Sequence, residues 1–202
     1  LLKLPEFFYG IVAFICCMVS TLLIFKISKR GNKIEVNTLL IVGITLSSFL
    51  AGFTSFAIYM IGEDSFKITM WLMGYLGNAS WSQIVFLIIP LIFSSAYFYA
   101  KRNELDILML GDEQAHSLGI DIAKLKFHLL IVSSFVVAYS VAFTGMIGFV
   151  GLIVPHIMRS IIGPLNARLI PFVLIYGGIF LLVCDTFGRI ILAPVEIPIG
   201  VI

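Results

Sequence analysis

The sequence predicts an all-α fold: a polytopic bundle of transmembrane helices. Of its 202 residues, 60% are hydrophobic and only 12% are charged, whereas a typical soluble domain carries about 25% charged residues. Long stretches contain no charge at all, and about 20 apolar residues form a helix that crosses roughly 30 Å of hydrocarbon. The composition therefore excludes a soluble enzyme, a disordered protein and a nucleic-acid-binding protein.

Windows without Asp, Glu, Lys or Arg mark the predicted spans, because an ionised side chain near the bilayer centre is costly. We expect six to seven helices, all within one partial transmembrane domain covering residues 1–202. The segment 188–202, which contains Pro194 and Pro198, is predicted to be a turn leading into the truncated seventh helix. The six predicted spans are 7–25, 36–62, 81–100, 124–144, 149–162 and 169–183.

Local signals fix two of these boundaries. Ser80 followed by Gln83 has the spacing of a capping box, so a helix is expected to begin directly after Ser80. The preceding residues, 66–79, should then lie at the membrane interface. Gly145, Gly148 and Gly151 interrupt the next long window, and glycine is unfavourable inside a helix, so this window is divided into two helices.

Basic residues in the short loops predict the orientation. With the chain start outside, three basic residues (Lys3, Lys67 and Arg189) lie outside and the other ten lie inside. If the segment 149–162 only dips into the membrane and returns, the distribution becomes nine against four. Charge counting leaves both topologies open.

The second predicted helix carries small residues on one face. They recur every four residues, which places them in one row along the helix. Such a row lets another helix pack closely, or forms a wall of a pathway or a dimer face, and both readings stay open. The row consists of Gly43, Ser47, Ala51 and Ser55.

No predicted span has a charged residue near its middle, which counts against a proton-coupled or ion-coupled carrier. The three cysteines and three histidines lack the spacing of a zinc site. We therefore predict no metal and no cofactor. His156 follows Pro155, which frees a backbone carbonyl, and a hydrogen-bonded structural role is favoured for this histidine over a ligand role.

The polar stretch 101–126 is longer than a connector needs and contains a short predicted helix. A glycine precedes this helix, two acids occupy its first turn and a glycine follows it, as the helix dipole and a C-terminal stop favour. Its apolar residues recur at helical spacing and should face either the membrane surface or a protein partner. The apolar residues are Ala115, Leu118 and, further on, Ile122. The candidate site residues of this helix are Gly111, Asp112, Glu113, Ala115, Leu118 and Gly119.

Three motifs follow one another in a specific order: residues 111–119, the run Gly-Met-Ile-Gly-Phe-Val-Gly-Leu-Ile-Val-Pro-His at 145–156, and Ala-Pro-Val-Glu-Ile-Pro-Ile-Gly at 193–200. Together they resemble the permease subunits of ATP-driven (ABC) importers for iron-siderophores, haem and cobalamin. The likeness extends along nearly the whole chain, and Met146 departs from the Pro or Ala often found there. The motif residues expected to be structural are Gly145, Gly148, Gly151, Pro155, His156, Pro198 and Gly200.

The resemblance implies a multi-pass protein of the cytoplasmic (inner) membrane with ten helices and both termini in the cytoplasm. This chain would cover helices four to nine and the approach to helix ten, and the segment that contains His156 would cross the membrane. It would import a metal chelate by alternating access without being an enzyme, since it also lacks a phosphate-binding Gly-x-x-x-x-Gly-Lys-Ser/Thr loop. The implied partners are a cytoplasmic ATPase subunit, an extracytoplasmic substrate-binding protein and a second permease copy or homologous permease.

The resemblance also assigns roles to individual positions. Residues 111–119 would be the helix that couples the permease to the ATPase, within the cytoplasmic loop 101–126. The helix that contains residues 43–55 would line the pathway, with Asn37 and Thr38 near the inner gate. Arg189 would dock on acids of the binding protein, the alternative being a charge that faces lipid headgroups.

Two rival functions need features that the sequence lacks. An ion-coupled secondary transporter or channel should have a buried charge or a selectivity ring. A membrane-embedded enzyme should have a catalytic set on facing helices. Neither pattern is present. Which chelate is carried (siderophore, haem or cobalamin) stays open.

Overall fold

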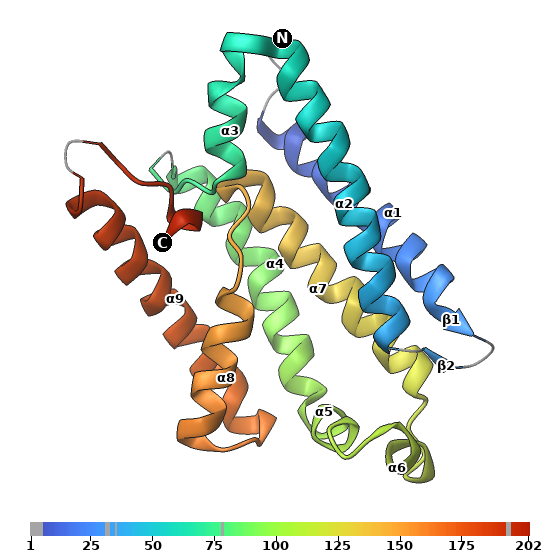
Figure 1. Ribbon diagram of the computed structural model, residues 1–202. Helices are drawn as coiled ribbons and strands as arrows, with labels where there is room; N and C mark the ends of the chain where they lie inside the picture. Colours follow the sequence, from blue (N-terminus) through green and yellow to red (C-terminus); the bar gives the residue numbers. More distant parts are fainter. Residues whose placement is uncertain (1–5, 31–32, 35, 78, 193–194) are drawn as a thin grey trace. The chain divides into compact units, whose positions relative to one another are not determined.

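The computed structural model describes residues 6–30, 33–34, 36–77, 79–192 and 195–202. These residues are almost entirely helical (Figure 1), with one two-residue antiparallel pair, β1 (Lys29–Arg30) and β2 (Lys33–Ile34). The all-α prediction is confirmed. The helices are α1 (Glu6–Ser28), α2 (Val36–Ile61), α3 (Phe66–Leu72), α4 (Trp81–Ala100), α5 (Arg102–Leu108), α6 (Asp112–Ser117), α7 (Ile122–Thr144), α8 (Val150–Ile162) and α9 (Asn166–Ile190), with single 3-10 turns η1 (Gly62–Ser65) and η2 (Ile199–Val201).

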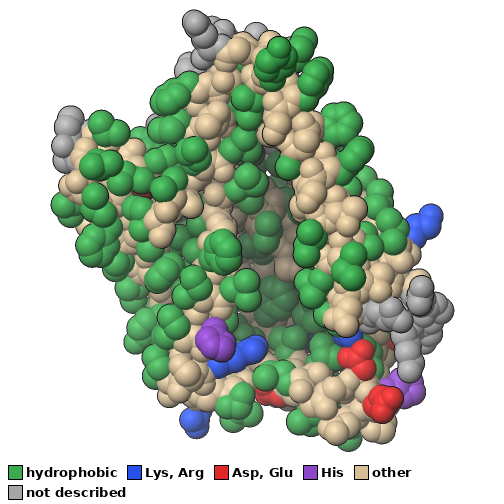
Figure 2. Space-filling model, in the orientation of Figure 1, with side chains coloured by type: hydrophobic (Ala, Val, Ile, Leu, Met, Phe, Trp, Pro, Cys, Tyr) green, Lys and Arg blue, Asp and Glu red, His purple; other side chains and the backbone are tan. Residues whose placement is uncertain are grey.

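Five of these helices, α1, α2, α4, α7 and α9, are long and apolar enough to cross a membrane, and α8 is a shorter apolar helix. Hydrophobic side chains are accordingly spread over the surface seen in Figure 2, and charged ones are few. The structure divides into two compact units: residues up to Met70 with Asp121–Ala142, and Trp71–Ile120 with Phe143–Ile202.

In the first unit, α1 packs along the part of α7 that belongs to it. The rings of Phe14 and Phe135 meet edge to face with their centroids 5.3 Å apart. The hydroxyls of Thr21 and Ser134 are hydrogen-bonded at 2.8 Å. The second long helix of this unit, α2, contacts α1.

In the second unit, α8 packs against α9. Apolar residues recur every fourth position along α8 and place one face of the helix on α9. Val154 and Met158 are buried there against Leu169 of α9. Val150, Ile162, Val173 and Phe180 extend this core.

The capping box predicted for α4 is present. The Ser80 hydroxyl accepts a hydrogen bond from the Gln83 backbone N–H, and the Gln83 side chain accepts one from the Ser80 N–H. The helix therefore begins at Trp81, as expected. Pro90 lies inside it and is buried.

The predicted bounds of the last long helix were too short. We expected residues 169–183, whereas α9 runs from Asn166 to Ile190. A charge-free window marks only the apolar middle of a helix, because charged side chains are tolerated in its end turns. Here Arg189 pairs with Asp185 one turn earlier, at 2.8 Å, on the same face.

The segment between α7 and α9 runs the full length of the second unit. Thr144, the last residue of α7, accepts a hydrogen bond from the backbone N–H of Tyr75. Tyr75 in turn contacts Glu196, a partner of Arg189 near the end of α9. Asn166, at the other end, begins α9. Because α9 has 25 residues and is therefore about 37 Å long, the segment 145–165 joins regions near its two ends, as the crossing topology expects; the membrane topology itself stays a prediction.

Candidate functional site

Helices α5 and α6 form a compact turn in the polar loop, with a glycine at each end of α6. Gly111 precedes the helix with φ 110°, and Gly119 follows it with φ 84°. Other residues rarely adopt these angles, so the two glycines set the bounds of the helix. Asp112 and Glu113 occupy the first turn, where the helix dipole favours negative charge.

The two apolar positions of α6 differ in exposure. Leu118 is 62% exposed, whereas Ala115 is 0% exposed. The expectation that Ala115 faces a membrane or a partner is therefore wrong. The chain folds back after the helix, where the Ile120 N–H donates to the Ala115 carbonyl at 3.2 Å, and sequence spacing does not reveal such a return.

The residues around Leu118 form a mixed surface that we call the α6 patch. Its apolar members are exposed side chains just before and after α6, and its acidic members belong to the first turn. Figure 2 shows acidic side chains gathered at this end of the molecule. The α6 patch consists of Met109, Leu110, Asp112, Glu113 and Leu118.

Helix α5 is bonded to the start of α9 by a pair that the sequence analysis did not identify. Asp106 Oδ1 accepts hydrogen bonds from the backbone N–H of Asn166 at 2.9 Å and from its Nδ2 at 2.7 Å. The partners are sixty residues apart in sequence. The one available signal was indirect: Leu165 precedes α9 where a polar capping residue is usual.

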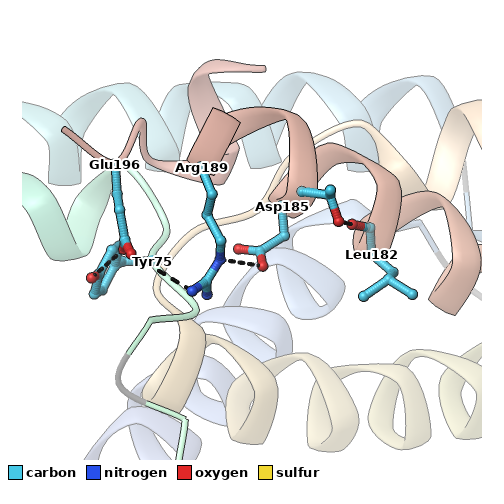
Figure 3. A network of polar contacts seen from close by, with 6 residues as sticks. Tyr75, Leu182, Asp185, Arg189 and Glu196 are labelled. Carbon is cyan, nitrogen blue, oxygen red and sulfur yellow. Dashed lines mark hydrogen bonds and ion pairs between the residues drawn. The ribbon is translucent and has the colours of Figure 1, made fainter. Parts of the chain in front are cut away.

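A polar cluster lies at the other end of α9 (Figure 3). Arg189 Nε donates to Asp185 at 2.8 Å, and its Nη1 lies 3.6 Å from Glu196. The Tyr75 hydroxyl donates to Glu196 at 2.6 Å. This hydrogen bond raises the pKa of Tyr75, because losing the proton would break it beside a carboxylate. Arg189, predicted as a docking residue, is therefore already paired with two carboxylates of its own chain.

Three backbone segments cross beside this cluster, and we call this contact the glycine crossing. The Ile199 N–H donates to the Gly74 carbonyl and the Gly200 N–H to the Met73 carbonyl, both at 3.0 Å. A Cβ at Gly74 would lie 2.7 Å from the Met146 carbonyl, closer than real contacts allow. A Cβ at Gly145 would overlap the Trp71 carbonyl, and one at Gly200 would overlap that of Met73.

The other motif residues lie apart from this crossing. A Cβ at Gly148 or Gly151 would meet nothing within 4 Å in the described structure. Pro155 lies within α8, and His156 is exposed, with no hydrogen bond to its ring from any described residue. The expected hydrogen-bonded role for His156 is therefore not found. Phe149, which the sequence analysis did not single out, precedes α8 with φ 61°.

The small-residue row of α2 is left uncovered by the described chain. Ser47, Ala51 and Ser55 are exposed, and Gly43 has open space where a Cβ would be. Asn37 is exposed near the start of the helix, while Thr38 is half-buried. Across the ranges that the structure describes, no group of three His, Cys, Asp or Glu side chains could hold a metal ion.

Comparison with known proteins gives consistent matches along the chain. The cobalamin import system permease protein of Halobacterium salinarum is 35% identical over 94% of this chain and 51% of its own length. The hemin transport system permease protein of Yersinia pestis is 32% identical over 94% of this chain and 57% of its own. The chain thus spans between half and three fifths of these curated relatives.

The fold has a solved counterpart. A structure described as an inward-facing conformation of a metal-chelate type ABC transporter matches with a TM-score of 0.80 and 28% identity, over 92% of this chain and 58% of that one. The model of one transport family matches residues 1–202. The chain is a multi-pass membrane protein and belongs to the FecCD transport family.

Proposed function

We propose that this chain is the larger part of the permease subunit of an ABC importer that moves a metal chelate across the cytoplasmic membrane by alternating access. The observation that carries the proposal is the family match over all 202 residues. The names of the two relatives, a cobalamin and a hemin transport permease, support a corrinoid or porphyrin chelate as the cargo, and a ferric siderophore is the third candidate.

The α6 patch is the proposed contact with a cytoplasmic ATPase subunit. It combines exposed apolar side chains with two acids, so it suits a groove with apolar walls and a basic rim. Glycines with positive φ at both ends hold α6 in a defined position at the surface. Movement of the ATPase subunits would then reach the membrane helices through this loop.

ATP-driven uptake by the complete assembly tests the function. The full-length permease, its ATPase and its binding protein are placed in proteoliposomes, and uptake of radiolabelled cobalamin, haem and a ferric siderophore is measured with and without ATP. Uptake of at least one of them should require ATP and the binding protein. Lack of ATP-driven uptake of all three would contradict the proposal.

Leu118→Arg tests the α6 patch in the same assay. We expect loss of uptake and of ATPase binding, because a buried arginine without a partner is costly at an apolar contact. Asn103→Arg adds the same charge at an exposed position of the neighbouring helix α5 and should leave both unchanged. Normal ATPase binding by Leu118→Arg would remove the patch from the interface. Ala115→Arg is unsuitable, since that side chain is buried.

Arg189 is proposed as a docking residue for an acidic group on the binding protein. Its pairing with Asp185 and Glu196 makes charge reversal of Arg189 ambiguous, because the cluster itself would break. Replacing its partners, as Asp185→Asn with Glu196→Gln, is more informative. Stronger binding-protein affinity would support docking by the freed guanidinium, and weaker or unchanged affinity would assign Arg189 to the internal cluster.

The uncovered row on α2 is proposed to face the pathway or the second permease copy, with Asn37 and Thr38 at its inner end. The support is that no described part of the chain covers Ser47, Ala51 or Ser55. Small side chains there would leave room for a bulky chelate or for a closely packed helix.

A further inference from the structure

The loop helix α5 provides the polar cap that α9 lacks in its own sequence. The first N–H groups of a helix have no partner within it, and Leu165, which precedes α9, offers no side-chain acceptor. Asp106 supplies one from α5, through two hydrogen bonds to Asn166. Asn166 is only 7% exposed, so water cannot readily replace the carboxylate.

The contact is more than a single bond. The Asn166 Nδ2 also lies 3.9 Å from the Met109 sulfur, so Asn166 contacts two residues of the α5 region. Helix α5 packs against both α9 and α6. An anionic acceptor at the positive end of a helix is a strong, directional contact, so it opposes sliding of α5 across the end of α9.

Helices α5 and α6 pack against each other and are joined by a tight turn at residues 109–111 whose N–H groups are all hydrogen-bonded. The N–H groups of Met109, Leu110 and Gly111 donate to carbonyls of α5, and the Ala115 N–H donates back to Gly111. A displacement of α6 should therefore be carried by α5 rather than absorbed between them. At the far end of the second unit, α9 ends in the cluster of Arg189, Asp185 and Glu196.

We infer that Asp106 is a positioning residue that makes α5 and α9 move as one body, so that a force applied at α6 reaches the opposite end of α9. This inference rests on the proposed function, since it specifies how the ATPase contact would act on the membrane helices. It assigns the coupling to the contact between Asp106 and Asn166 rather than to the loop as a whole.

The first test separates coupling from folding. In the full assembly in proteoliposomes, Asp106→Ala should retain ATPase binding and ATP hydrolysis but lose about tenfold in cargo imported per ATP, within the usual range of coupling energies. Asp106→Asn keeps an acceptor oxygen, so its ratio of cargo imported per ATP should stay close to that of the wild type. Asp121→Ala is the matched control, because Asp121 caps the start of α7 through the Lys124 N–H at 3.1 Å without linking two helices; its coupling ratio should stay normal.

A second test replaces the contact between positions 106 and 166 by a covalent cross-link. Asp106→Cys with Asn166→Cys, in a full-length background without other cysteines, should be uncoupled until a short thiol-reactive bifunctional reagent joins the two positions, and coupled afterwards. An unchanged ratio in Asp106→Ala, a cross-link that restores nothing, or failure to cross-link would each overturn the inference. Absence of ATP-driven uptake in the wild-type assembly would instead contradict the proposed function.

Discussion

Helices α8 and α9 pack against each other, whereas α2, which is also long and apolar, buries none of its described residues. Val154, Met158 and Leu169 are buried between α8 and α9. The backbone segments that contain Gly74, Gly145 and Gly200 meet at the glycine crossing. In lipid an exposed apolar face carries no penalty. Helix α2 therefore shows that apolar composition places a helix in the membrane without specifying what covers it.

The largest expected effect contrasts two glycines. Gly145→Ala places a methyl group on the Trp71 carbonyl at a residue with φ 72°, so we expect a loss of about 3 kcal/mol or more, or no folded protein. Gly43→Ala meets nothing within 4 Å of the described chain and should stabilise α2 by about 0.5–1 kcal/mol.

Unfolding of the full-length protein in detergent micelles measures both glycine variants. Similar changes in the free energy of unfolding would remove the contrast between the two regions. If Gly43→Ala also lowered the free energy of unfolding, a further helix or a second copy would have to pack on the row of α2.

The next largest effect is the loss of stability when a buried side chain is shortened and leaves a cavity. Leu169 is 3% exposed between α8 and α9, so Leu169→Ala should lose about 2 kcal/mol through lost packing. Ile44→Ala on α2, at a side chain 67% exposed, is the matched control and should change the unfolding free energy little. Equal losses would mean that α2 is packed as closely as α9 in the complete protein.

A smaller effect comes from the hydrogen bond between Tyr75 and Glu196, which ties the segment after α9 to the loop after α3. Tyr75→Phe should cost about 1 kcal/mol. Since the pKa of Tyr75 is raised in the folded state, its contribution is present below about pH 10 and is lost as pH rises through the folded pKa.

A pH titration of unfolding checks this linkage. Wild type should lose stability above pH 10 by more than Tyr75→Phe, which has no phenol to titrate at this position. Identical alkaline profiles would show that the hydrogen bond does not contribute to stability.

The smallest structural perturbation reports on the face of α2. Ser47→Cys, in a full-length background without other cysteines, should leave stability nearly unchanged and react with a small polar thiol reagent in at least one transport state. Protection in every state would indicate that the row is packed against a helix. Phe49→Cys, at an exposed side chain two residues further on α2, provides the comparison for a differently directed position.

Much of the secondary structure was predictable because its signals are local. The capping box at Ser80 and Gln83 fixed the start of α4, and the glycines at 111 and 119 bounded α6. Charged residues misled the prediction for α9, since Asp185 and Arg189 pair within the helix. Burial of Ala115 was missed because the chain folds back after α6, which helical spacing cannot reveal.

The sequence by itself determined that the protein lies in a membrane, roughly where its long helices run and which motifs it carries, because composition and capping act over a few neighbouring residues. Only the tertiary structure decided that Asp106 caps α9, that Glu196 joins Tyr75 to Arg189, and that Gly74, Gly145 and Gly200 share one crossing. These contacts join residues far apart in the chain, and their geometry depends on how the helices pack.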